Sequence, residues 1–373
     1  MADRRWTTAD FDYPLPEDLI AQSPSRQRGE SRLLVVEREA GREPAAAAQT
    51  RRPISPHPDT SAAAHAPRQP IRDLAFPALL DLIPAGDLVV LNTTKVRHAR
   101  LLGTRPGGGP AEVLLLHPAG DDTWLAMGKP GRALQPGKRV LLDDAVAIEV
   151  VDIDEEGFRR VRFIGSDAAG AIARFGHLPL PPYITREAGA DDEERYQTVY
   201  AQREGSVAAP TAGLHFTTEL LDAMRDQGIE FASIDLEVGP GTFRPVEADD
   251  PTAHPMHAEI FEIPDEAARQ VAAARERGAA VWAVGTTVVR ALESAARDDG
   301  SVEPGRRDTR LLILPGHRFR VVDHLVTNFH LPRSSLLMLV GAFAGVEPIL
   351  AAYRHAVEQR YRFYSYGDAM CIL

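Results

Sequence analysis

Hydrogen-bonding and aromatic side chains stand together at residues 327–332, in the order Thr-Asn-Phe-His-Leu-Pro. The run follows a predicted apolar strand and precedes a predicted apolar helix, so it forms the turn between two buried elements. Open α/β sheets bind ligands at the carboxyl ends of their strands, where such turns lie. The pattern therefore predicts a reaction site that includes Asn328, Phe329 and His330.

A second turn that could bind a ligand is the Val-Gly-Thr-Thr run at residues 284–287, which ends a predicted strand and opens a predicted helix. The free amides and the positive dipole end of a helix N-terminus favour anions. We therefore expect an anion site around Thr286, with Arg290 one turn further on. The alternative is an ordinary capped helix in which Arg290 pairs with Glu293.

Small residues at 210–214 lead to His215 and Phe216, just ahead of a predicted helix. A histidine near a helix N-terminus has its charged form disfavoured, so His215 suits a neutral base or a hydrogen-bonding partner. The alternative is a histidine that only holds its loop in shape. The aromatic tail at 364–370 can sandwich a flat ring, or can simply dock the end of the chain.

His254, His257 and Glu259 form an H-x-x-H-x-E run, a pattern that can bind a metal ion. Pro255 interrupts the local geometry, and the chain has no H-E-x-x-H pattern. No metal is therefore expected, although a metal site stays an alternative.

Length and composition restrict the class of protein. With 373 residues, 44% hydrophobic and 25% charged, the chain has the composition of soluble globular proteins and the length of two domains. No run of 18 apolar residues indicates a membrane span, and residues 1–12 lack the apolar core of a secretory signal. The single cysteine, Cys371, excludes an internal disulfide. A cytoplasmic protein is expected.

A net charge of −11 argues against a broad surface that coats nucleic acid. Basic side chains nevertheless cluster locally at residues 26–32 and 95–105. They are either a phosphate-binding patch or, as the alternative, ordinary solvated charges.

Strand and helix patterns divide the chain into two parts. Short β-rich runs with Gly/Pro turns at 99–165 are typical of a small β-barrel or sandwich. From residue 217 onward, alternating helices and strands favour a layered α/β domain. We predict an α/β main domain over 1–98 and 166–373, into which the β-barrel of 99–165 is inserted.

Residues 39–70 are rich in Ala, Pro and Arg and contain no aromatic residue. Such a segment buries too little apolar area to offset its ordering entropy, so it is predicted to be a disordered insert. A strand is expected before it at 31–37, and a short helix after it at 71–82.

Taken together and in this order, the motifs resemble one family, the S-adenosylmethionine:tRNA ribosyltransferase-isomerases of queuosine biosynthesis. The resemblance spans nearly the whole chain. Its motifs lie at residues 11–13, 19–22, 31–34, 86–92, 99–101, 178–184, 196–200, 208–216, 241–243, 256–259, 285–287, 327–332 and 363–370. Two departures are the length of the 39–70 insert and the Arg97-His98 pair, where the family typically has Ile-Pro. The second departure could alter the domain junction.

The resemblance implies a larger α/β domain with an inserted small β-barrel, and it implies a reaction. The ribosyl part of S-adenosylmethionine moves onto the aminomethyl group of 7-aminomethyl-7-deazaguanine at the wobble position of tRNA. The products are epoxyqueuosine-tRNA, adenine and methionine. S-adenosylmethionine is then a co-substrate, with no further cofactor and no membrane partner, and a monomer is expected.

The pathway proposed for that family needs two groups that handle protons. A base removes the C5′ proton that the sulfonium acidifies, and adenine leaves. The amine, once deprotonated, then attacks C1′, and the epoxide closes as methionine departs. Histidines or tuned carboxylates suit both tasks. The candidates are His215, His330, Asp323 and Glu259.

Binding candidates follow from the same chemistry. Donors for the methionine carboxylate are Gly285, Thr286, Thr287 and Arg290. Asn328 is a further substrate contact, and rings that can stack on a purine-like base are Phe216, Phe329 and Tyr366. Candidates to meet tRNA phosphates are Arg26, Arg32, Lys95 and Arg100.

Two other functions stay open on the sequence alone. One is a metal-dependent hydrolase of a nucleotide-like substrate, which would use His254, His257 and Glu259. The other is a relative that binds tRNA without catalysis.

Overall fold

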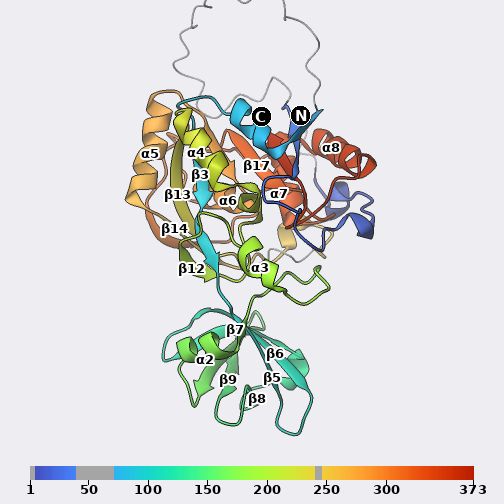
Figure 1. Cartoon of the computed structure of the whole chain (residues 1–373), viewed down its shortest axis with the longest axis vertical. Helices are drawn as coiled ribbons and strands as arrows, with labels where there is room; N and C mark the ends of the chain where they lie inside the picture. Colours follow the sequence, from blue (N-terminus) through green and yellow to red (C-terminus); the bar gives the residue numbers. More distant parts are fainter. Residues whose placement is uncertain (1–4, 39–70, 240–245) are drawn as a thin grey trace, which may run out of the picture.

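The computed structural model describes residues 5–38, 71–239 and 246–373, and in it a large helix-covered sheet stands above a smaller β-barrel (Figure 1). The sheet has nine strands in the order β16-β14-β13-β3-β15-β17-β18-β1-β2. Their bounds are β1 Arg32–Val36, β2 Ile71–Ala75, β3 Leu88–Asn92, β13 Glu230–Leu236, β14 Glu259–Ile263, β15 Val281–Val284, β16 Gly305–Thr309, β17 His324–Asn328 and β18 Ala369–Ile372.

The centre of the sheet is parallel. β13, β3, β15 and β17 pair in parallel, so their carboxyl ends lie at one edge. β18 runs antiparallel to β17, with Ala369 opposite Asn328. The segment that precedes β18 therefore reaches the same edge as the turn that follows β17.

Helices cover both faces of the sheet, because the central strands are apolar on both sides. In β15, Val281 and Ala283 belong to one hydrophobic cluster, whereas Trp282 and Val284 belong to the other, as the twofold side-chain alternation of a strand requires. The helices on the first face are α5 Asp265–Glu276, α6 Thr286–Ser294, α7 Ser335–Ala344 and α8 Val346–Glu358. Those on the second face are α1 Leu79–Leu82 and α4 Thr218–Asp226.

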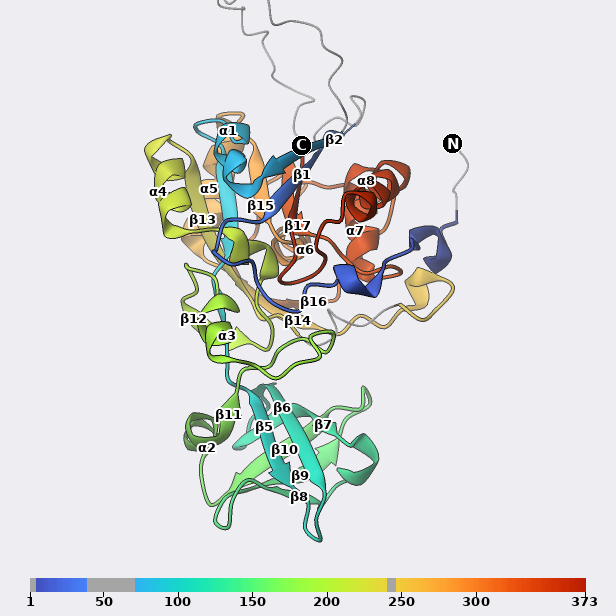
Figure 2. The same cartoon turned by 45° about the vertical axis from the view of Figure 1, so that its right-hand side comes forward.

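A barrel forms the second part (Figure 2). Its sheet has the order β11-β5-β6-β7-β10-β9-β8, and an additional β5–β8 pairing closes six of these strands into a ring. The bounds are β5 Arg100–Thr104, β6 Pro110–Pro118, β7 Thr123–Lys129, β8 Arg139–Leu141, β9 Ala147–Ile153, β10 Arg159–Ile164 and β11 Gly176–His177, with helix α2 at Ala168–Phe175. The predicted fold class, an α/β domain with a small β-barrel, is confirmed; the division at 98/99 and 165/166 stays a prediction.

Short elements complete the chain. A two-stranded sheet of β4 Thr94–Val96 and β12 Arg203–Ser206 lies between barrel and main sheet, close to α3 Ala190–Arg195 (Figure 2). Single 3₁₀ turns are η1 Thr8–Phe11, η2 Glu17–Leu19, η3 Phe76–Ala78, η4 Gly131–Ala133, η5 Thr211–His215 and η7 Pro251–Ala253.

The predicted helix over 71–82 is wrong in its first half. Ile71–Ala75 is strand β2, and only Leu79–Leu82 is α-helical. The strand forms because all five of its residues find antiparallel partners in β1, a contact between segments that the 39–70 insert separates. That insert lies outside the described residues, as does the 241–243 motif.

Among the described residues, no single helix is long and apolar enough to cross a membrane. Taken together, the bent pair α7 and α8 has the length and the apolar composition of a membrane-spanning segment. Eight of the ten residues of α7 are buried inside the main domain, which accounts for its apolar character.

Candidate functional site

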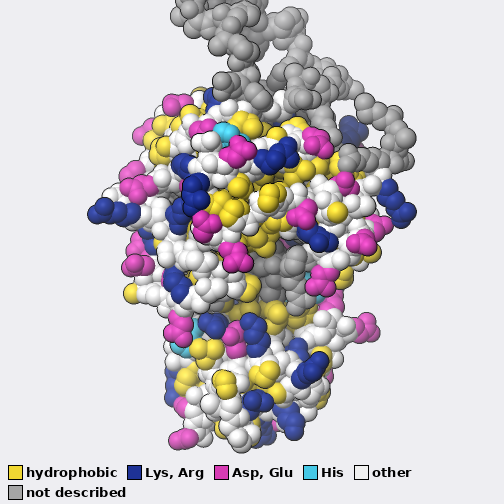
Figure 3. All heavy atoms as spheres, turned by 90° about the vertical axis from the view of Figure 1, so that its right-hand side faces the viewer, with side chains coloured by type: hydrophobic (Ala, Val, Ile, Leu, Met, Phe, Trp, Pro, Cys, Tyr) yellow, Lys and Arg dark blue, Asp and Glu magenta, His cyan; other side chains and the backbone are white. Residues whose placement is uncertain are grey.

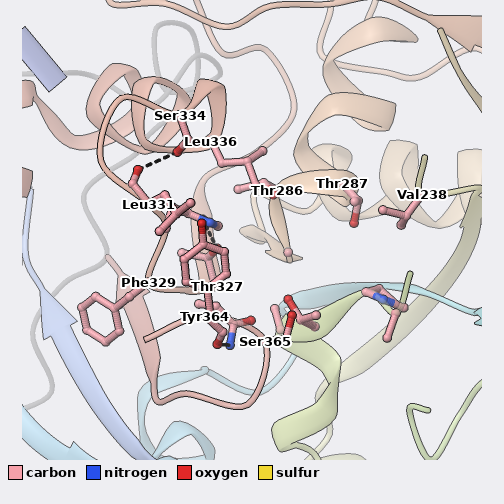
Figure 4. Close-up of a pocket in the computed structure, with 17 residues that line it drawn as sticks. Val238, Thr286, Thr287, Thr327, Phe329, Leu331, Ser334, Leu336, Tyr364 and Ser365 are labelled. Atoms are coloured by element: carbon pink, nitrogen blue, oxygen red, sulfur yellow. Dashed lines mark hydrogen bonds between the residues drawn. The ribbon is translucent and has the colours of Figure 1, made fainter. Parts of the chain in front are cut away.

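A cavity lies at the carboxyl edge of the parallel strands (Figure 4). It contains about 680 Å³ of space free of protein atoms, including solvent at its mouth. Segments distant in the sequence supply its walls, as expected for the ligand sites of open α/β sheets. The lining residues are Ala209, Pro210, Thr211, Ala212, Val238, Gly285, Thr286, Thr287, Thr327, Asn328, Phe329, His330, Leu331, Ser334, Leu336, Tyr364 and Ser365.

His330 is part of the cavity wall and is held from several sides. Its Nε2 lies 2.9 Å from Thr327 Oγ1, and its backbone N–H donates to the Tyr353 hydroxyl over 3.0 Å. The Tyr13 hydroxyl donates to the His330 carbonyl over 2.6 Å. Burial lowers the pKa of His330 to about 3, so the imidazole is neutral at physiological pH.

His215 stands behind the wall rather than in it. Its Nε2 lies 3.1 Å from Asn328 Nδ2, and its Nδ1 lies 2.7 Å from Ser31 Oγ. The Phe76 ring packs against the imidazole at 5.1 Å between centroids. Burial, with smaller contributions from Arg28 and Arg362, lowers the pKa of His215 to about 3. The imidazole is therefore neutral, and both ring nitrogens are already engaged.

The start of α6 forms the opposite wall. Gly285 has φ 96°, a left-handed value that glycine adopts freely, and its N–H donates to the Val326 carbonyl over 2.7 Å. The chain thus turns sharply from β15 into the helix. Thr286 and Thr287 line the cavity, and the Thr287 hydroxyl is buried without a hydrogen-bond partner among the described residues.

Arg290 pairs with Glu259, and both side chains are buried. The expected alternative, a pair with Glu293, is wrong, because Glu293 instead accepts backbone N–H groups of residues 320–322. Arg290 Nε donates to the Leu311 carbonyl over 3.1 Å, while Nη2 is buried without a partner in the described part of the chain. Burial lowers the pKa of Arg290 to about 10, so it stays charged at neutral pH.

None of the three rings expected to stack on a base presents its face to the cavity. The Phe329 ring packs on Tyr353 and Phe363, and Figure 4 shows it directed away from the side where Thr287 and Val238 lie. Two others, Phe216 and Tyr366, are not among the described lining residues. Phe216 packs against Phe76, and the Tyr366 hydroxyl donates to Asp192.

Tyr364 is the aromatic side chain of the cavity wall that the sequence reasoning missed. Its φ of 74° is in the left-handed region, which is rare for an aromatic residue and marks a constrained turn. Its carbonyl accepts the Gly367 N–H, and a Cβ at Gly367 would lie 2.4 Å from the Arg362 carbonyl oxygen. The turn therefore requires glycine. The sequence signal for Tyr364 was the aromatic tail at 364–370, but the sequence did not indicate which way the Tyr364 side chain points.

Asp323 lies at the amino end of β17, whereas the cavity lies at the carboxyl end. Its carboxylate accepts from Arg275 Nη1 over 2.6 Å and from the Val281 N–H over 2.9 Å. The structure thus separates Asp323 from the other candidates for proton transfer.

The H-x-x-H-x-E run does not converge on one point. His257 Nδ1 lies 2.8 Å from a carboxylate oxygen of Glu156 in the barrel, and Glu259 pairs with Arg290. Among the described residues, no three His, Cys, Asp or Glu side chains are placed to hold a metal ion. The metal-dependent hydrolase is therefore not favoured.

The four basic candidates for phosphate contact lie in different parts of the molecule. Arg32 pairs with Asp368 and stacks on Tyr361, with 3.8 Å from its guanidinium carbon to the ring centroid. Lys95 pairs with Glu204 in the two-stranded sheet, and Arg100 with Glu112 in the barrel. Arg26 is exposed on the loop before β1.

The fold and the cavity together define a class: an α/β protein with an inserted barrel and a cavity at the carboxyl edge of its parallel strands. A family model described as "Queuosine biosynthesis protein" matches residues 8–372. The chain belongs to this family.

Relatives are similar over their full length. The S-adenosylmethionine:tRNA ribosyltransferase-isomerase of Natranaerobius thermophilus is 45% identical over 97% of this chain and 98% of the relative. The enzyme of that name from Anaeromyxobacter sp. is 48% identical over 98% of both chains. A crystal structure of the S-adenosylmethionine tRNA ribosyltransferase of Thermotoga maritima matches with a TM-score of 0.52 and 33% identity, over 98% of this chain and 100% of the other.

Proposed function

We propose that the chain is an S-adenosylmethionine-dependent tRNA ribosyltransferase-isomerase. It moves the ribosyl group of S-adenosylmethionine onto 7-aminomethyl-7-deazaguanine at the tRNA wobble position, and releases adenine and methionine. The observation that supports this most is the cavity, because most of its lining residues belong to the motifs at 209–212, 285–287, 327–331 and 364–365. The relatives named S-adenosylmethionine:tRNA ribosyltransferase-isomerase are similar to this chain over almost their whole length, which supports the proposal.

The lining suits a cationic co-substrate. No Lys, Arg, Asp or Glu is among the described lining residues, and burial keeps the pKa of His330 far below neutrality. A sulfonium therefore meets no like charge among these described residues. The amides of Thr286 and Thr287, at the positive end of α6, are the proposed donors to the methionine carboxylate.

His330 is the proposed acceptor of the C5′ proton, because it is the neutral imidazole in the wall itself. The glycosidic C–N bond of S-adenosylmethionine then breaks, and adenine takes up a proton. The substrate amine gives up a proton and forms the new bond to C1′, and the epoxide closes as the C5′–S bond breaks and methionine leaves. Glu259 acts through Arg290, which it holds beside the α6 wall. Asp323 has no part in the proposal because of its distance along β17.

A direct test incubates the purified chain with S-adenosylmethionine and tRNA that carries 7-aminomethyl-7-deazaguanine. Mass analysis of the digested tRNA should show the epoxyqueuosine nucleoside, with adenine and methionine released in equal amounts. Binding of both substrates without adenine release would instead support a non-catalytic tRNA-binding protein. The exposed Arg26 and the half-buried Lys95 are the proposed phosphate contacts, and a strong salt dependence of tRNA affinity is expected from them.

A further inference from the structure

Asn328 occupies the cavity wall with its amide held in one orientation. Its Nδ2 donates one hydrogen to the Tyr364 carbonyl and the other to His215 Nε2, each over 3.1 Å. A carbonyl oxygen only accepts, so the nitrogen of the amide must face it. The orientation of Asn328 therefore follows from its partners.

This orientation also determines the state of His215. Since Asn328 donates to Nε2, that nitrogen carries no proton, and the neutral ring holds its proton on Nδ1. Nδ1–H then donates to Ser31 Oγ, 2.7 Å away. A protonated His215 would set two donors against each other, and burial lowers its pKa to about 3. His215 is thus a positioning residue in the chain Ser31–His215–Asn328.

The oxygen of the same amide takes no part in these two hydrogen bonds. Asn328 is only 3% exposed, and Oδ1 has no hydrogen-bond partner among the described residues. Buried acceptors without partners are rare in native proteins, because the lost hydration is not replaced. An unpaired acceptor in the wall of a ligand cavity points to a donor on the ligand.

The position of Asn328 indicates which donor this is. β15 pairs in parallel with β17, with Val284 opposite Val326, so the start of α6 runs beside Asn328. Neighbouring strands lie about 4.8 Å apart, a separation that the carboxylate and ammonium of one α-amino acid can span. The amides of α6 suit the carboxylate, and Asn328 Oδ1 stands next to them as the acceptor.

We propose that Asn328 Oδ1 accepts a hydrogen bond from the α-ammonium group of the methionyl moiety, and that Ser31 and His215 hold the amide in that orientation. This inference rests on the proposed function, since it takes S-adenosylmethionine as the ligand of the cavity. It assigns His215 to positioning and leaves the proton transfer at C5′ to His330.

The test compares two ligands on the full-length chain by calorimetry: S-adenosylmethionine and its analogue without the α-amino group. Asn328→Ala should weaken binding of S-adenosylmethionine about tenfold to a hundredfold, the range of a hydrogen bond to a charged group. Its affinity for the des-amino analogue should equal that of the wild type. Equal losses for both ligands, or no loss for either, would overturn the proposal.

Asn92 offers a matched control. It is a second buried amide at a strand end, but it spends its bonds on Leu236 and Thr94 and is not among the described lining residues. Asn92→Ala should lower stability and change the affinity for the two ligands equally. If it alone discriminates between them, the assignment of Asn328 is wrong.

The positioning chain has its own readout. His215→Gln can keep an acceptor near Nε2 and should preserve discrimination between the two ligands, whereas His215→Leu should lose it. Nitrogen NMR should show His215 protonated on Nδ1 at pH 7, and the opposite tautomer would overturn the chain. If Asn328→Ala does not fold, the comparison of His215→Gln with His215→Leu tests the proposal, through their discrimination between the two ligands. A wild-type chain that binds no S-adenosylmethionine refutes the proposed function as well; one that binds both ligands alike refutes only this inference.

Discussion

The two histidines that share the site differ in what surrounds their nitrogens. His330 borders the cavity and its Nε2 has the Thr327 hydroxyl as partner, whereas His215 is enclosed between Ser31 and Asn328. Both are neutral because burial disfavours the imidazolium. As residue types the two histidines are equivalent. Their partners distinguish them: His330 is the proposed proton acceptor, and His215 is the positioning residue.

Replacement of His330 tests the proton acceptor. His330→Ala should lower the rate of adenine release by about a hundredfold to ten-thousandfold, the usual contribution of a general base. Adenine is followed by chromatography, and circular dichroism checks that the variant is folded. The exposed His177 provides the control, since His177→Ala should turn over like the wild type. Undiminished turnover of His330→Ala would remove it from the catalytic role.

The buried histidines also predict how stability depends on pH. The pKa of His330 is about 3 in the folded chain against 6.5 ordinarily, so the unfolded chain binds the proton first. Its contribution to stability is complete above pH 6.5 and is lost as pH falls toward 3. The loss amounts to about 1.4 kcal/mol per pH unit.

Urea unfolding between pH 7 and pH 4 measures this slope. His330→Gln should reduce it by about 1.4 kcal/mol per pH unit, because one buried imidazole no longer titrates. His177→Gln should leave it unchanged, since His177 is exposed in the barrel. An equal effect of both substitutions would contradict the assignment to burial.

At the scale of elements, the site depends on how the strands enter and leave it. Glu293 of α6 accepts the backbone N–H groups of Arg320, Val321 and Val322 at 2.9 to 3.0 Å. These residues lead into β17, whose far end carries Asn328. One carboxylate thus fastens the helix of one wall to the strand of the other.

Glu293→Gln should loosen this connection. An amide offers one acceptor oxygen where the carboxylate offers two, so at least one buried N–H loses its partner, at about 1.5–3 kcal/mol for a bond to a charged group. Chemical denaturation measures the change in unfolding free energy. Glu276→Gln, on the exposed side of α5, is the control and should be neutral. If Glu293→Gln lowered the free energy of unfolding no more than Glu276→Gln does, the connection would not contribute to stability.

At the scale of the molecule, an acidic side chain of the barrel contacts two residues of the main domain. Glu156, in the turn between β9 and β10, binds His257 Nδ1 at 2.8 Å and Arg310 Nη2 at 3.0 Å. A further cavity beside these contacts lies between barrel and main domain. The face in Figure 3 shows hydrophobic side chains at this junction and many Lys and Arg side chains over the barrel below it.

Glu156→Gln should free the barrel from its present position. The substitution removes the charge that both partners bind, so small-angle scattering should show a larger radius of gyration, and a protease should cut the junction faster. Glu155→Gln, one residue away and exposed, should leave both measurements unchanged. Identical behaviour of the two variants would show that other contacts hold the barrel.

Local signals determined much of this protein. Side-chain alternation, turn residues and capping residues act over a few positions, so the sequence alone predicts the α/β class, the barrel and most elements. For example, the Thr217 side chain caps α4 by accepting the Leu220 N–H. The turn motifs at 285–287 and 327–332 were located for the same reason, because strand ends in such sheets meet at one edge.

Only the tertiary structure decided which side of each motif meets the cavity. Phe329 turns into the core while its neighbours Asn328 and His330 border the cavity, and Asp323 lies at the opposite end of the strand. β2 forms because β1 supplies its partners. These outcomes depend on packing between residues far apart in the chain, and no local pattern carries that information.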